Sequence, residues 1–156
     1  MKISQTLTPG LCAIFATQVF AQTPAPAASR RNQYHLDRMR RALAAMSKHT
    51  LVTEEGRIAD KEFHAALLLA TGNPFIVSLT NGVTAAVDAL TEFKQRIAPI
   101  KRDATPDHWR VYDAVAAKDA ERARTAMAEL IRLAIMDTPI KQRPRGPRRA
   151  SRSTTF

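Results

Sequence analysis

Apolar residues recur at helical intervals through the central part of the chain, with polar and charged residues between them. An interval of three or four positions returns a side chain to the same face of an α-helix. The first predicted helix, over residues 33–49, has such a stripe in Leu36, Met39, Leu43 and Met46. The second, over residues 58–71, has one in Ala59, Phe63, Ala66, Leu67 and Ala70, and Gly72 and Asn73 then end it.

The longest predicted helix begins at Pro74, because a proline suits the first turn of a helix, and it stops before Pro99. Its apolar residues keep a spacing of three and four over three heptads: Ile76, Leu79, Val83, Ala86, Leu90, Phe93 and Ile97. A stripe of this length predicts that one face of the helix is buried against other helices.

Two further helices complete the pattern. Thr105 and Pro106 signal the start of a helix that runs to Lys118, and Asp119 can cap a last helix that runs to Thr138. Their inward stripes are His108, Val111, Tyr112 and Val115, and then Ala123, Met127, Leu130 and Ala134. No segment has the alternation of a strand. The sequence therefore predicts an all-α fold, an antiparallel bundle of about five to six helices.

A chain of 156 residues, 45% of them apolar, has room for one domain with a real core. The helical pattern assigns residues 33–139 to that domain, residues 1–32 to an N-terminal segment and linker, and residues 140–156 to a tail. Residues 23–31 are rich in Pro, Ala and Ser and predict the linker. The single cysteine, Cys12, excludes an internal disulfide and a cysteine-rich zinc site.

Residues 1–21 have the pattern of a secretory signal. Lys2 precedes an apolar run over residues 11–20, and Val19 and Ala21 are the small residues before a cleavage site. The run is too short to cross a bilayer as a helix, so no transmembrane span is expected. Two interpretations stay open: cleavage after Ala21 and export, or a divergent, loosely packed or disordered N-terminus on a cytoplasmic protein.

The net charge of +10 would suggest a nucleic-acid or membrane partner if it were spread over the fold. All 14 acidic residues lie between Gln33 and Thr138, where 15 lysines and arginines leave a net charge of only +1. The excess lies at the ends, and six of these basic residues are in the tail: Lys141, Arg143, Arg145, Arg148, Arg149 and Arg152. We expect a disordered, solvated tail, with nonspecific contacts to nucleic-acid phosphates as the alternative.

Asp60 and His64 are four positions apart on a predicted helix, so both project from one side and could share a cation. His108 lies on the same inward stripe as Val111 and Val115, which predicts a buried imidazole that needs a partner. Each feature alone is weak. A pair of this spacing is often a surface ion pair, and an inward histidine is often a hydrogen-bonded core residue.

Two motifs at matched separations resemble the FCD domain, the effector-binding domain of FadR-type and other GntR-family transcription regulators. The first is DKEFH at residues 60–64, followed by ATGNP at residues 70–74. The second is HWRVYDAV at residues 108–115, followed by the Lys118–Asp119 pair and by Ala126–Met127 in the last helix. The resemblance extends from about Tyr34 to Asp137.

This resemblance implies a helical bundle that forms a homodimer, binds a small organic acid and passes the binding event to an N-terminal winged-helix domain. Many members of the family hold a divalent metal with one Asp and three His. Asp60, His64 and His108 match three of these ligands, and Leu130 stands at the position of the fourth. Zinc or nickel could still bind if water or the effector completed the shell. The alternative is a decayed site that binds no metal. Asn81 is a separate candidate, as a residue of the effector pocket.

Two departures from the family matter for function. No winged-helix sequence precedes the resemblance, so this chain by itself is not expected to read a DNA sequence. The segment before Tyr34 also differs from the first helix of the family, so part of the heptad stripe in the longest helix should be exposed. Such a patch favours dimerisation or aggregation, or residues 11–20 could cover it.

The sequence therefore favours the ligand-sensing and dimerisation domain of a GntR-type regulator, located in the cytoplasm and not an enzyme. An exported helical binding protein with a basic tail is the main alternative. A metal-dependent hydrolase is less favoured, because no Ser or Cys nucleophile with a partnered base is evident and no general base is identifiable.

Overall fold

The computed structural model describes residues 22–97 and 102–138, and within these ranges all regular structure is helical. The helices are α2 (Pro24–Arg30), α3 (Gln33–His49), α4 (Glu54–Ala70), α5 (Pro74–Ser78), α6 (Thr80–Ile97), α7 (Thr105–Ala116) and α8 (Ala120–Met136). The prediction of an all-α bundle is confirmed. The predicted signal sequence and the basic tail lie outside the described residues.

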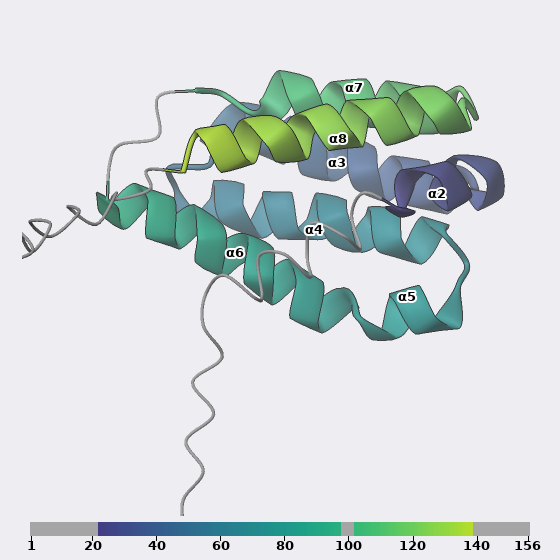
Figure 1. The fold of residues 1–156 in the computed structure, drawn as a ribbon, viewed down its shortest axis with the longest axis horizontal. Coiled ribbons are helices and arrows are strands. Elements are labelled where there is room, and N and C mark those ends of the chain that lie inside the picture. Colours follow the sequence, from purple (N-terminus) through teal and green to yellow (C-terminus); the bar gives the residue numbers. More distant parts are fainter. Residues whose placement is uncertain (1–21, 98–101, 139–156) are drawn as a thin grey trace, which may run out of the picture.

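Figure 1 shows α4 in the middle of the molecule, with the antiparallel pair α7 and α8 on one side and α6 on the other. The helix α3 packs against both α4 and α7. The short helices α2 and α5 lie at the end of the bundle where α4 terminates (Figure 1). This order places α4 between the two layers, so side chains from its opposite faces reach α7 and α6.

Polar residues fix where the long helices begin. Asn32 Oδ1 accepts a hydrogen bond from the backbone N–H of His35 at 3.1 Å, and His35 Nδ1 accepts one from the N–H of Asn32 at 3.3 Å. The Thr53 hydroxyl accepts from the N–H of Gly56 and starts α4. Asp119 caps α8 in the same way, as its position before the last stripe predicted.

Most of the core comes from the apolar stripes that the sequence predicted on the first, second, fourth and last helices. Its largest fully buried side chains are Met39, Leu43, Met46, Phe63, Leu67, Leu68, Val111, Val115 and Met127. These residues come from α3, α4, α7 and α8, so the four helices share one hydrophobic interior.

The predicted linker over residues 23–31 is wrong, because Pro24–Arg30 form the helix α2. Pro24, Ala27 and Ala28 are buried, and α2 packs against α4, α7 and α8. Alanine side chains are small enough for close helix packing, and a proline at the start of a helix loses no hydrogen bond. The folded domain therefore begins before residue 33.

The longest predicted helix is divided into α5 and α6, and its heptad stripe is only partly buried. Within α6, Val83 and Thr91 are buried, whereas Phe93 is 47% and Ile97 39% exposed. The side of α6 that packs on α4 is thus rotated away from the predicted stripe. The expectation that part of this stripe is exposed is confirmed.

In the described part of the chain, no helix is long and apolar enough to span a membrane.

Candidate metal centre

Three polar side chains meet inside the bundle between α4 and α7. Asp60 and His64 lie one turn apart on α4 and are 4% and 6% exposed, and His108, in the first turns of α7, is 3% exposed. Their ligand atoms, one from each residue, all lie within 4.8 Å of one another. The structure therefore brings together the three residues that the sequence proposed as metal ligands.

The two imidazole rings approach the same carboxylate oxygen. His108 Nε2 lies 3.0 Å and His64 Nε2 lies 3.6 Å from Asp60 Oδ1. Phe63 packs edge-on against both rings, at centroid distances of 5.4 Å from His64 and 5.1 Å from His108. A buried phenyl ring beside the three polar groups keeps bulk water from this side of the cluster.

The other ring nitrogen of His108 is held by the backbone. His108 Nδ1 lies 2.8 Å from the carbonyl oxygen of Ala104, which can only accept, so Nδ1 carries the proton. In the neutral ring this leaves the lone pair on Nε2, facing Asp60. A histidine that donates to a backbone carbonyl with one nitrogen and offers the other is the usual arrangement at a metal.

The residues present fit a cation. Asp60 Oδ1 and His108 Nε2 are buried, and neither makes a well-aligned hydrogen bond within the described residues. Buried polar atoms normally have a hydrogen-bond partner. The 3.0 Å approach of His108 Nε2 to Asp60 Oδ1 is therefore stable only with a proton or a metal ion between the two atoms. One carboxylate and two imidazoles are a donor set that zinc and nickel accept.

Without a metal, the pKa shifts favour an ion pair between Asp60 and His108 beside a neutral His64. Burial raises the pKa of Asp60, but the His108 imidazolium and His64 outweigh it and hold the pKa below its ordinary value. Burial lowers the pKa of His108, and the Asp60 carboxylate outweighs it, so the net shift is upward. Burial lowers the pKa of His64 to about 4, against the attraction of Asp60. His64 is therefore neutral at pH 7, as a metal ligand must be.

A second charged layer borders the cluster, and the sequence patterns missed it. Burial lowers the pKa of Lys94 on α6, while the carboxylates of Asp137 and Asp60 act in the opposite direction. Arg102 forms ion pairs with the buried carboxylate of Asp107 and, at 2.7 Å, with Asp137. The sequence did indicate the position of Lys94. It follows Val83, Val87 and Thr91 at helical spacing, and this row of residues faces α4.

The remaining site predictions lie elsewhere. Asn81 is exposed on the first turn of α6, whereas the α6 residue near Asp60 is Lys94, more than three turns further along. Leu130 is 5% exposed on α8 and belongs to the common hydrophobic core. A leucine there packs well and cannot coordinate a cation.

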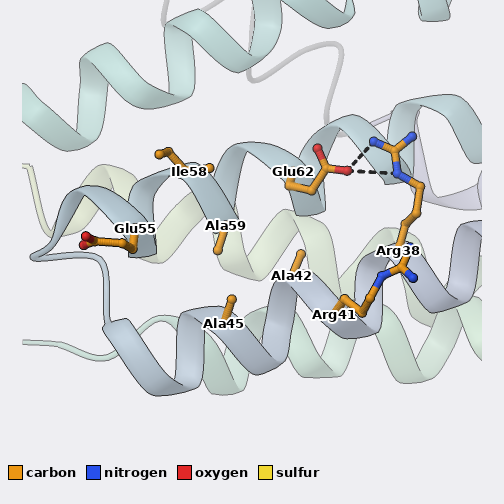
Figure 2. Close-up of a pocket in the computed structure, with 8 residues that line it drawn as sticks. All are labelled: Arg38, Arg41, Ala42, Ala45, Glu55, Ile58, Ala59 and Glu62. Atoms are coloured by element: carbon orange, nitrogen blue, oxygen red, sulfur yellow. Dashed lines mark hydrogen bonds and ion pairs between the residues drawn. The ribbon is translucent and has the colours of Figure 1, made fainter.

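A groove of about 270 Å³ lies on the surface between α3 and α4, and Figure 2 shows the residues that line it. It is lined by Arg38, Arg41, Ala42, Ala45, Glu55, Ile58, Ala59 and Glu62. Figure 2 shows the Arg38–Glu62 ion pair across one end of it. No ligand atom of the buried cluster faces this groove, so the two sites are separate.

An all-helical bundle with a carboxylate and two imidazoles gathered in its interior has the construction of a ligand-sensing regulatory domain. The family model described as the FCD domain matches residues 24–133, and the chain therefore belongs to the FCD domain family. The resemblance inferred from the sequence motifs is confirmed, and so is the prediction that the chain is not an enzyme. The match also begins with α2, in agreement with the packing of that helix.

Solved structures with a similar fold include GntR from Streptococcus agalactiae, with a TM-score of 0.65 and 14% sequence identity over 85% of this chain. McbR/YncC from E. coli has a TM-score of 0.67 and 15% identity over 81% of this chain. The chain covers 62% of the length of each of these two proteins. A comparison with curated protein sequences finds no match.

Proposed function

We propose that this chain is the sensing domain of a GntR-type transcription regulator, and that it binds a small organic acid at a divalent metal held by Asp60, His64 and His108. The observation that carries the proposal is the buried cluster itself, with His108 Nδ1 bound to the Ala104 carbonyl and Nε2 directed at Asp60 Oδ1. In this geometry the three ligand atoms already lie close together. A bound cation would take the place of a proton between His108 Nε2 and Asp60 Oδ1.

The donor set leaves room for an effector. Three protein ligands are fewer than the four of a closed structural zinc site, so a water or an effector carboxylate would complete the shell. The metal would supply a fixed positive charge that attracts a carboxylate. Zinc or nickel suits two imidazoles and one carboxylate, and the missing fourth protein ligand at Leu130 predicts an affinity lower than that of a four-ligand member.

The charges around the cluster agree with an anionic effector. A divalent ion on the single carboxylate of Asp60 would keep a net positive charge at the site. Lys94 lies on the same side, close enough to Asp60 and Asp137 for both carboxylates to affect its pKa. Because Lys94 is half-buried, solvent would screen a pairing of its ammonium group with an effector carboxylate less than at an exposed position.

Gene regulation needs a DNA-binding element and a location where DNA is present. The two solved neighbours named above are longer than this chain, which covers 62% of each. We propose that sequence-specific DNA binding is contributed outside the FCD domain and that the protein acts in the cytoplasm as a homodimer. Export after cleavage at Ala21 is the competing prediction, and it would rule out this role.

Thermal unfolding of the full chain tests the proposal. The midpoint is measured after EDTA treatment, then with zinc or nickel, and then with metal plus citrate, lactate or acetate. Binding to the folded state alone should raise the midpoint with metal, and the His108→Ala variant should abolish the rise. Arg40→Ala, an exposed change on α3, is the control. An unchanged midpoint with every metal would refute the metal centre, while stabilisation by an acid alone would indicate a metal-free sensor.

A further inference from the structure

Polar contacts between α4 and α6 place the last turns of α6 beside the first turns of α4. Lys61 Nζ lies 3.0 Å from Asp88 Oδ2, and Arg57 Nη1 donates to Gln95 Oε1 at 3.3 Å. Moving forward along α4 from Arg57 to Lys61 thus corresponds to moving back along α6 from Gln95 to Asp88. The two helices are therefore antiparallel, and Lys94, which precedes Gln95, lies beside the turns of α4 that carry the buried cluster.

Lys94 is a half-buried cation that has no anion of its own. It follows the buried Thr91 by three positions, so it lies on the side of α6 that faces α4 and Asp60. Within the described part of the chain its ammonium group forms no ion pair. Asp137, whose carboxylate also acts on the pKa of Lys94, is already paired with Arg102 at 2.7 Å. Buried charges are normally paired, so this ammonium group is available to a ligand.

A metal at the cluster would leave two separate positive centres at this end of the bundle. Figure 1 shows the end of α6, the start of α7 and the end of α8 together there. The nearby aspartates of α7 and of the segment after α8 are already paired with arginines. A divalent ion would engage the carboxylate of Asp60 and keep a net positive charge, so it would repel Lys94 where the free carboxylate attracts it. The metal and the ammonium group would then each need an anion.

We propose that Lys94 determines the specificity of the sensor site for a dicarboxylate: one carboxylate of the effector binds the metal, and the second binds the ammonium group of Lys94. The inference rests on the sensing function proposed above and narrows its ligand from organic acids in general to dicarboxylates. A monocarboxylate would bind the metal and leave Lys94 unpaired. A dicarboxylate gains a charge-assisted hydrogen bond at a half-buried position, where solvent screens it less than at the surface.

Isothermal titration calorimetry of the full chain loaded with nickel or zinc tests the second contact. Succinate is compared with butyrate, and glutarate with valerate, because the two acids of each pair have equal carbon chains and differ by one carboxylate. We expect the original chain to bind a dicarboxylate at least about tenfold more tightly than the matching monocarboxylate. Lys94→Met should remove this preference and leave the affinity for the monocarboxylate within about twofold. Lys94→Arg keeps the charge and should retain most of the preference.

Lys61→Met is the matched control, because Lys61 is the other half-buried lysine between α4 and α6 and is paired with Asp88. This variant should keep the preference for the dicarboxylate. Equal binding of both acids by the original chain overturns the inference, and so does a preference that Lys94→Met leaves intact. An equal loss of both acids in Lys94→Met would show a structural role and overturns it as well.

The unfolding midpoint with metal alone separates this inference from the proposed function. Stabilisation by metal without any preference for a dicarboxylate means that only the role of Lys94 is wrong. Absence of stabilisation by metal refutes the metal centre, and the site with two anion contacts is refuted with it.

Discussion

Arg31 in the segment after α2 donates to the backbone carbonyl of Ala116 at the end of α7, although 85 residues separate them in the chain. Its Nε atom also donates to the carbonyl of Val115 at 3.3 Å, and Arg30 donates to the carbonyl of Thr71 at the end of α4. The last carbonyl groups of a helix have no partner within it and carry partial negative charge. Two adjacent arginines thus join α2 to both helices that bear the proposed metal ligands.

Replacing Arg31 with methionine should lower the free energy of unfolding by about 1.5–3 kcal/mol, the range for hydrogen bonds to charged groups. The variant keeps the aliphatic length and removes the charge and the donors. Urea denaturation measures the change, and Arg40→Met, at an exposed position on α3, is the control. Equal stability of the two variants would mean that packing of Ala27 and Ala28 alone holds α2 in place.

Stability of the metal-free protein should fall as the pH is lowered from about 6.5 to 4. Burial lowers the pKa of His64 to about 4, so in this window the unfolded chain binds a proton at His64 that the folded chain does not. His108 has a raised pKa and is protonated in both states over most of the window, and Asp60, with a lowered pKa, is ionised in both over most of it. Because of His64, the free energy of unfolding should therefore be highest above pH 6.5 and should fall by about 3 kcal/mol towards pH 4.

The His64→Gln variant isolates this contribution, because glutamine does not titrate. Unfolding by urea in EDTA at several pH values should give a weaker dependence in the variant than in the original chain. His35 also has a lowered pKa, from burial and from Arg38, so a small slope of the same sign should persist. An identical slope in the two proteins would show that His64 is not buried as a neutral group.

Replacing Leu130 with histidine should strengthen metal binding if the family resemblance places the fourth ligand correctly. The metal-free variant should be less stable than the original chain, because a buried imidazole replaces a leucine of the core. Zinc or nickel should then stabilise the variant more than the original, with an affinity at least about tenfold higher from the added ligand. Isothermal titration calorimetry measures the affinity.

Leu133→His is the matched control, because it introduces the same side chain less than one turn further along α8. A gain in affinity at position 133 as well as at 130 would indicate a nonspecific effect of histidine. No gain at position 130 would mean that α8 does not direct this residue at the cluster.

The sequence predicted the class of fold and the three proposed ligands, because both depend on local spacing. Asp60 and His64 lie one turn apart in any helix, and the stripe around Val111 placed His108 inside. It did not predict α2, whose alanines are buried only through contacts with helices far along the chain. The rotation of α6, and with it the position of Lys94 near Asp60, also depends on tertiary packing that spacing alone does not encode.

Two glycines give opposite expectations for the same substitution. A Cβ atom at Gly56 would lie 1.5 Å from the carbonyl oxygen of Thr50, so alanine there must displace the backbone at the start of α4. Gly56→Ala should therefore lower the free energy of unfolding by about 3 kcal/mol or more, and should also weaken metal binding through Asp60 on the next turn.

Gly82 has open space around it within its own chain. Gly82→Ala should stabilise the monomer by about 0.4–1 kcal/mol, because alanine restricts the unfolded chain. Urea denaturation measures both changes. A loss of stability in Gly82→Ala as large as that in Gly56→Ala would mean that Gly82 is also enclosed by other atoms of its own chain.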